Sequence, residues 1–290
     1  APRAADSDTG EGSGPPPPYG PAQGEQAAAM GPDPVAIRPI VLVLGPSGAK
    51  GYAYAGVLRA LVDAKIPIGA IVGSDMGALI GALFGMSTSI NGFEWKMLQL
   101  KSEWFAAKTA GLGALFKQGN PRARLGLRLK ELFAGKDLRD SRVPLKILNF
   151  SASLQDSGDV AAAVFEVLIL PSAEANGVLN SPKAFPVAEA RALGIGPVVV
   201  IDVLEHMDEP VAVADGGERE AAVRDAVRLA ANRSVDELTQ ADLVIRPDLS
   251  KVKFTDFDRR SDAAYIGRTA TVAAMDEIRG LTSNREGKRP

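Results

Sequence analysis

The stretch IVLVLGPSGAKG, residues 40–51, joins a run of branched apolar residues to a glycine-rich turn. Five consecutive apolar residues, Ile40–Leu44, predict a strand that is buried on both faces. Apolar residues at helical spacing follow across residues 52–65, and Pro67 ends that predicted helix. A strand that leads through glycines into a helix is typical of a parallel α/β unit.

The same alternation of strand and helix continues along the chain. Residues 70–73 predict a second strand and residues 76–86 a second helix packed with small residues. Further strands are expected at 145–151, 198–203 and 242–245, with helices near 160–168, 184–193, 218–231 and 263–279. Only helical patterns, at 93–105 and 122–133, occur between residues 87 and 142. We therefore predict a three-layer α/β/α fold with a mainly parallel central sheet and a helical insertion at about residues 88–142.

The two ends of the chain differ in composition from this domain, which we place at residues 37–282. Residues 1–36 are rich in Pro and Gly, include four consecutive prolines at 15–18, and predict a disordered leader, while residues 283–290 predict a flexible tail. The leader lacks the apolar core of a signal peptide. It fits the tether of an exported, periplasmic or membrane-anchored protein after signal removal, which we favour, or the natural leader of a cytoplasmic protein.

Composition excludes several classes of function. The formal net charge is -2 and the sequence pI is near 5.7, which argues against a nucleic-acid partner and favours a small-molecule or lipid partner. No cysteine is present, so disulfides and thiolate catalysis are excluded. The single histidine, His206, excludes a multi-histidine metal site, and no acidic cluster replaces it. We expect neither a metal nor a cofactor, and the oligomeric state stays open.

The glycine-rich turn at residues 45–51 is the first candidate for a functional site. Such a turn places backbone N–H groups at a helix N-terminus, where negative charge is stabilised. The spacing fits neither a Walker loop nor a dinucleotide fingerprint, so nucleotide binding is disfavoured. The turn predicts an anion or oxyanion site made by Ser47, Gly48, Ala49, Lys50 and Gly51.

A second motif, Gly73-Ser74-Asp75-Met76-Gly77, lies between the second strand and the second helix. Glycines on either side of a central residue are the spacing of a nucleophile elbow. The strained turn leaves no room for a β-carbon beside the exposed central residue. The motif therefore predicts that Asp75 stands at the apex of the elbow.

Together these motifs resemble the bacterial patatin-like phospholipases. The likeness runs unbroken over about residues 40–84, and weaker likeness continues at 143–145, 158–163, 187–193 and 241–248. The resemblance implies a hydrolase that cleaves acyl esters with a serine–aspartate dyad and no histidine, and that uses the glycine-rich loop as an oxyanion hole. It also implies an acyl-chain or lipid ligand.

This sequence departs from the family pattern in both members of the dyad. Asp75 occupies the position of the serine, and a carboxylate is a much weaker acyl acceptor than a hydroxyl. Alignment on residues 187–193 places Ala175 where the family has the aspartate of a D-G-G segment. A literal Asp215-Gly216-Gly217 occurs one structural unit later, so Asp215 is either a displaced dyad partner or part of an ordinary Asp-Gly turn. In the hole, Pro46 has no N–H to donate.

Two hypotheses of function follow. In the first, the domain is a catalytically inactive protein that binds acyl lipids or acts as a scaffold. In the second it is an active hydrolase, for instance one that uses Asp75 as a nucleophile in the manner of dehalogenases, which normally needs a histidine such as His206. Ser47 and Ser74 are better explained as turn residues than as displaced nucleophiles. If Asp75 pointed at the amides of the loop, it would fill the anion site itself.

Three further features bear on how the domain packs and what it could contact. The basic, amphipathic segment 121–142 predicts either a cap helix with a solvated basic face, which we favour, or a peripheral membrane contact. Lys50 is either a solvated lysine or an anion contact. Trp95 and Trp104, with Phe93 and Phe105, are interpreted as core and cap packing.

Overall fold

The computed structural model describes residues 37–105, 121–149, 151, 153–168, 184–204, 225, 228–229 and 231–283, all within one compact unit, Ala36–Pro290. The predicted leader lies outside these residues, as does the predicted tail apart from Ser283, which forms an isolated antiparallel bridge with Ile37 of the domain. Most of the helix predicted at 218–231 also lies outside them.

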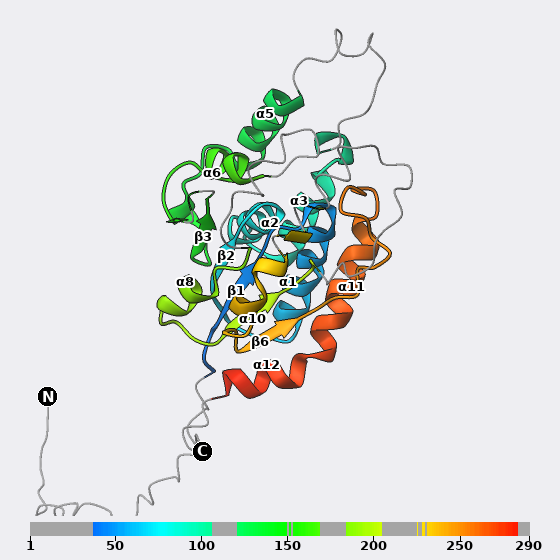
Figure 1. Ribbon diagram of the computed structural model, residues 1–290. Coiled ribbons are helices and arrows are strands. Elements are labelled where there is room, and N and C mark those ends of the chain that lie inside the picture. The colour runs from blue at the N-terminus through cyan, green and yellow to red at the C-terminus, as the bar shows by residue number, and fades with distance from the viewer. Residues whose placement is uncertain are drawn as a thin grey trace, which may run out of the picture. The chain divides into compact units, whose positions relative to one another are not determined.

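A six-stranded sheet forms the centre of the unit (Figure 1). Its order is β4-β3-β2-β1-β5-β6, and every neighbouring pair is parallel except β3 and β4. The mainly parallel sheet of the sequence prediction is thus confirmed. The strands are β1 (Ile40–Leu44), β2 (Ile68–Gly73), β3 (Leu145–Leu148), β4 (Leu154–Gln155), β5 (Val198–Ile201) and β6 (Leu243–Ile245).

Side chains of β1 alternate between two cores, which shows that helices cover both faces of the sheet. Ile40, Leu42 and Leu44 pack in one core with residues of α1 (Ala53–Asp63) and α2 (Met76–Gly85). Val41 and Val43 pack in the other with residues of α8 (Val187–Ala192) and α10 (Val235–Leu238). Helices therefore lie on both faces of the sheet, which confirms the predicted three-layer α/β/α arrangement. Parallel sheets are usually covered in this way.

The first core also contains the last long helix, α11 (Arg260–Ala273), which packs closely along α1. Two glycines make the approach possible. A β-carbon on Gly56 would lie 1.8 Å from the Ala264 carbonyl oxygen, and one on Gly267 would lie 2.1 Å from the Ala53 carbonyl oxygen. The two helix backbones are therefore in contact, with no side chain between them at these points.

Several predicted elements are divided by local backbone geometry. The helix predicted at 263–279 is two helices, α11 and α12 (Met275–Thr282), separated at Ala274. The helix predicted at 93–105 is α3 (Ile90–Gln99) followed by the 3-10 turn η2 (Ser102–Trp104), because Leu100 is extended. The strand predicted at 145–151 ends at Leu148, where the side chain of Asn149 accepts hydrogen bonds from the Ser151 and Ser153 amides and the chain returns as β4.

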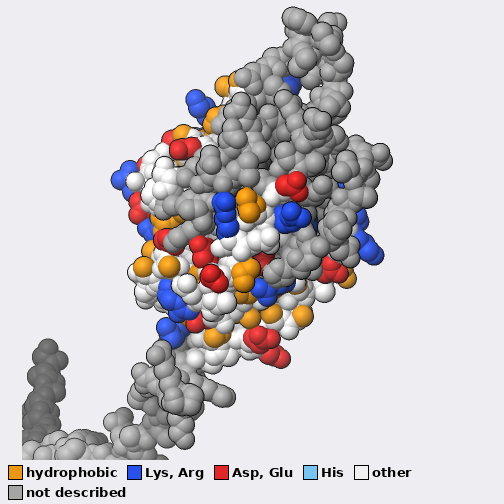
Figure 2. All heavy atoms as spheres, in the orientation of Figure 1, with side chains coloured by type: hydrophobic (Ala, Val, Ile, Leu, Met, Phe, Trp, Pro, Cys, Tyr) orange, Lys and Arg blue, Asp and Glu red, His pale blue; other side chains and the backbone are white. Residues whose placement is uncertain are grey.

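The amphipathic segment behaves as a cap helix. In α5 (Pro121–Phe133), Leu125, Leu129 and Phe133 are buried against the core, and the helix contacts α6 (Val160–Val167). Its basic side chains Arg124, Arg128 and Lys130 are exposed, and the 3-10 turn η3 (Leu138–Asp140) follows. On the face drawn in Figure 2, basic and acidic side chains are interspersed.

The interpretation of Trp95 as core or cap packing is wrong, since this residue is 66% exposed. Its neighbours on the inner face of α3, Phe93 and Met97, supply the packing instead. Helical periodicity explains the difference, because residues 93 and 97 lie one turn apart while residue 95 faces the opposite side. None of the described helices is both long and apolar enough to cross a bilayer.

Candidate active site

The two glycine-rich turns leave the sheet side by side. Leu44, the last residue of β1, is paired with Gly73, the last residue of β2. Just beyond the strands, the Ser74 amide donates a hydrogen bond to the Leu44 carbonyl at 3.1 Å. Because the strands are parallel, both turns emerge at the carboxyl edge, where ligand sites of α/β sheets collect.

Asp75 stands at the apex of the elbow, immediately before α2. Its backbone has φ 50° and ψ -128°, a strained conformation that costs about 1–3 kcal/mol in a non-glycine residue. The flanking glycines are required by space. A β-carbon on Gly73 would lie 2.8 Å from the Ala78 amide nitrogen, and one on Gly77 would lie 2.1 Å from the Leu44 carbonyl oxygen. The structure thus places Asp75 in a strained, tightly packed turn between β2 and α2.

The carboxylate of Asp75 points at the glycine-rich loop. Its Oδ2 atom accepts hydrogen bonds from the Ser47 amide at 2.9 Å and from the Gly48 amide at 2.8 Å, and Asp75 is only 1% exposed. The first two N–H groups of the predicted oxyanion hole therefore bind a carboxylate of the same chain. The third, on Ala49, donates to the Phe254 carbonyl at 2.8 Å, so it is engaged elsewhere.

The rest of the loop is a 3-10 turn, η1 (Gly48–Tyr52), which contacts the start of α2. Lys50 is only 7% exposed, so the interpretation of this residue as a solvated lysine is wrong. Gly51 is needed for close packing, because a β-carbon there would lie 2.4 Å from Ser47 Oγ and 2.7 Å from Met76 Cβ. Both turns are thus held together by backbone contacts as well as by Asp75.

The structure adds Tyr54 and Asp202 to the surroundings of the site. The Tyr54 hydroxyl donates to the Gly45 carbonyl at 3.0 Å, and burial raises the pKa of this phenol well above its usual value. Asp202 follows β5 directly; it accepts a hydrogen bond from the Leu204 amide at 3.1 Å and pairs with Arg246 at 3.2 Å. An acidic residue immediately after an apolar strand is the sequence signal that would have identified Asp202.

A group of aromatic side chains covers η1 on the side of α11. The rings of Tyr52 and Phe257 meet edge to face at 6.4 Å, and Phe257 stacks on Phe105 at 4.9 Å. Tyr52 is 1% exposed, and its hydroxyl has no hydrogen-bond partner in the described part of the chain. Burial, opposed by Arg260 and reinforced by Asp258, raises the pKa of Tyr52 to about 12. The phenol is therefore a neutral hydrogen-bond donor at physiological pH.

Asp215 and His206, the two other candidates for catalysis, lie outside the described residues, as does Ala175, the position aligned with the aspartate of the family. Within the described ranges, no group of three or more His, Asp or Glu side chains is placed to hold a metal ion. The site consists of a strained apex, a carboxylate and a loop whose first amides are occupied.

Comparison with known proteins identifies a family. The sequence model of the family described as patatin-like phospholipase matches residues 42–235. Among curated proteins, patatin-like phospholipase domain-containing protein 7 of Rattus norvegicus is 50% identical over 50 residues, which are 17% of this chain and 4% of the relative. Patatin-like phospholipase domain-containing protein 6 of Homo sapiens is 37% identical over 73 residues, which are 25% of this chain and 5% of the relative.

These curated relatives are far longer than the matched segments. Lysophospholipase nte1 of Aspergillus fumigatus is 43% identical over 53 residues, which span 18% of this chain and 4% of that protein. Among solved structures, the type III effector ExoU covers 83% of this chain and 54% of its own at 15% identity, with a TM-score of 0.41. VipD from Legionella pneumophila covers 83% and 67% at 12% identity, with a TM-score of 0.42.

Proposed function

This chain belongs to the patatin-like phospholipase family, and from its site we propose that it is a catalytically inactive member which binds acyl lipids or serves as a scaffold. The observation that supports the proposal is the pair of hydrogen bonds from the Ser47 and Gly48 amides to Asp75 Oδ2, at 2.9 Å and 2.8 Å. A single residue thus removes the hydroxyl nucleophile and also occupies the donors that would stabilise an oxyanion.

Ester hydrolysis by a serine enzyme needs both of these elements. The nucleophile attacks the carbonyl carbon, and preorganised N–H groups bind the negative oxygen that develops in the transition state. Removal of one such donor lowers the rate by roughly 10²–10³ in hydrolases of this kind. Loss of the nucleophile together with two occupied donors argues for binding without turnover.

A hydrolysis assay on purified protein tests the proposal. The substrates are a short-chain nitrophenyl ester and a lysophospholipid, and the proteins are the wild type, Asp75→Ala and Asp75→Ser. We expect no turnover above the uncatalysed rate for the wild type and Asp75→Ala. Wild-type hydrolysis that Asp75→Ala abolishes would overturn the proposal.

The alternative is a hydrolase in which Asp75 is the nucleophile, and the strained backbone of this residue favours it. The φ of 50° is the geometry that presents a side chain for attack in nucleophile elbows. Attack by the carboxylate on a saturated carbon would form an ester with the enzyme and either release halide from a haloalkane or open the C–O bond of an epoxide ring; water would then cleave that ester and restore the carboxylate. Turnover of a haloalkane or epoxide that is lost in Asp75→Ala, with no labelling by a fluorophosphonate, would support this alternative.

A further inference from the structure

The hydroxyl of Tyr52 is a buried donor that the fold does not use. Tyr52 is 1% exposed, and among the residues that the structure describes its oxygen has no hydrogen-bond partner. A buried polar group without a partner lowers stability, and most such groups in native proteins are satisfied by protein or by something bound. A phenylalanine would fill the same place without this penalty. The unpaired phenol therefore points to a ligand.

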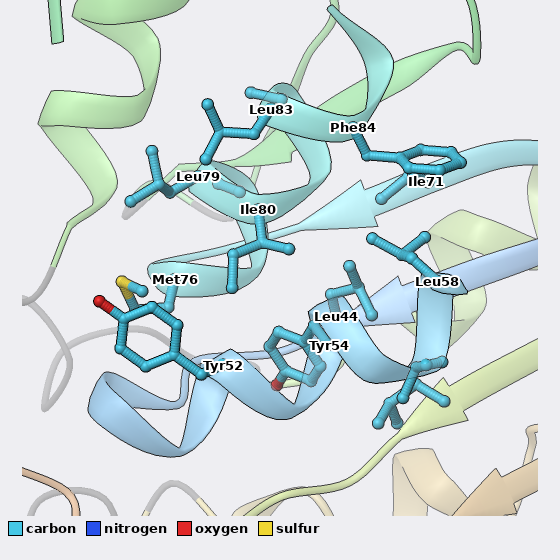
Figure 3. Close-up of a cluster of buried hydrophobic side chains, with 14 of the residues drawn as sticks. Leu44, Tyr52, Tyr54, Leu58, Ile71, Met76, Leu79, Ile80, Leu83 and Phe84 are labelled. Atoms are coloured by element: carbon cyan, nitrogen blue, oxygen red, sulfur yellow. The ribbon is translucent and has the colours of Figure 1, made fainter. Parts of the chain in front are cut away.

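This hydroxyl belongs to the turn that carries the predicted oxyanion hole. Tyr52 is the last residue of η1, whose first residue, Gly48, donates its amide to Asp75. Its ring is in the same buried cluster as Met76, which directly follows Asp75 in the sequence, and Figure 3 draws the two side chains next to each other. The hydroxyl of Ser74, which directly precedes Asp75 in the elbow, is also buried and has no hydrogen bond to any described residue.

The surroundings of Tyr52 define the kind of ligand. The side chains packed around Tyr52 are apolar: its ring meets that of Phe257, which in turn stacks on Phe105, and Met76 lies in the same buried cluster. The amides that would attract an anion already bind the Asp75 carboxylate, which would repel a second negative charge. An uncharged group that accepts a hydrogen bond and carries an acyl chain fits these conditions better than a fatty-acid anion.

We propose that the Tyr52 hydroxyl donates a hydrogen bond to the ester carbonyl of an uncharged acyl lipid, in place of the Ser47 and Gly48 amides. This inference rests on the proposed acyl-lipid binding and specifies its ligand class and its polar contact. The carbonyl is held by a neutral donor away from the elbow apex, which is consistent with binding but no hydrolysis. Because the hydroxyl is shielded, the Phe257–Phe105 pair has to shift as the ligand enters.

Calorimetric titration with two chemically matched probes tests the inference. The probes are monodecanoylglycerol, an uncharged ester, and decanoate, its anion, both below the concentrations at which they aggregate. The proteins are the full-length wild type, Tyr52→Phe, and Tyr265→Phe as a matched control, because Tyr265 is 72% exposed. We expect the wild type and the control to prefer the ester, and Tyr52→Phe to bind it about tenfold more weakly, as loss of one hydrogen bond implies.

The thermal midpoint of each protein without ligand keeps the result interpretable. Tyr52→Phe retains the ring and removes only an unpaired hydroxyl, so its midpoint should equal or exceed that of the wild type. Equal affinity of Tyr52→Phe and wild type for the ester would overturn the role of Tyr52 while leaving acyl-lipid binding in place. Tighter binding of decanoate would overturn the ligand class. No wild-type binding of either probe would overturn acyl-lipid binding and this inference together.

Discussion

The elbow and the contact between α1 and α11 both depend on a glycine that allows close backbone contact, but the two regions differ in rigidity. At each place a glycine lets two backbones touch, Gly77 against Leu44 in the elbow and Gly56 against Ala264 between the helices. We expect the two packed helices to shift apart more easily than the elbow, which is joined to the paired ends of β1 and β2. The elbow therefore owes its shape to backbone packing, and the side chain at its apex can change chemistry without loss of the turn.

The largest effect is expected for Gly77→Ala. Its β-carbon would lie 2.1 Å from the Leu44 carbonyl oxygen. Leu44 is held in β1, and Gly77 lies in the first turn of α2, which the short elbow ties to β2, so we expect a loss of about 4 kcal/mol in the free energy of unfolding. Denaturant titration measures it. The control is Gly280→Ala, where an added β-carbon would meet no described atom within 4 Å beyond its chain neighbours and the backbone of its own helix, and a gain of about 0.5–1 kcal/mol is expected. Similar values for both would contradict the steric account.

A smaller loss is expected for Gly56→Ala at the helix contact. The overlap with the Ala264 carbonyl oxygen is even closer, 1.8 Å, but α1 and α11 can move apart to relieve it. We expect a loss of about 2–3 kcal/mol in the same titration. If Gly56→Ala were more damaging than Gly77→Ala, rigidity would not distinguish the two regions.

Replacement of Asp75 tests the polar contact at the apex separately from the backbone. Asp75→Ala leaves the Ser47 and Gly48 amides without their acceptor, and we expect a loss of about 2 kcal/mol. Asp75→Asn keeps a side-chain oxygen and should lose about half as much. Thermal unfolding of the two variants gives the order. A stability of Asp75→Ala equal to that of the wild type would mean that the contact contributes nothing.

The smallest loss of stability is expected for the exposed ion pairs of Arg59 on α1. Arg59 pairs with Asp63 at 2.9 Å and with Glu94 at 3.0 Å, but all three side chains are about a third or more exposed. Removal of Arg59 in Arg59→Ala should cost about 0.5 kcal/mol, less in high salt because exposed ion pairs are screened. Unfolding at low and high ionic strength checks this. A salt-independent loss above that size would indicate packing by the arginine stem instead.

The parallel sheet was predictable because its strands are short, continuous apolar runs that end in glycine or polar residues. The points at which two of the predicted helices are divided could not be predicted from the sequence. Ala274 has good helix propensity, yet the chain breaks there, and Leu100 is extended although apolar periodicity continues around it. β4 was missed because two residues carry no periodic pattern, and their pairing depends on the turn made by Asn149.

In the site, the sequence by itself determined the two turns and the substitution at their apex. Glycine spacing reports steric demands of the local backbone, so the strained position of Asp75 could be read from residues 73–77 alone. Tertiary structure decided where its carboxylate lies, because the Ser47 and Gly48 amides come from a turn 27 or 28 residues earlier along the chain. It also decided that Lys50 and Tyr52 are buried. Burial depends on the elements that pack over a residue, and no local pattern contains that information.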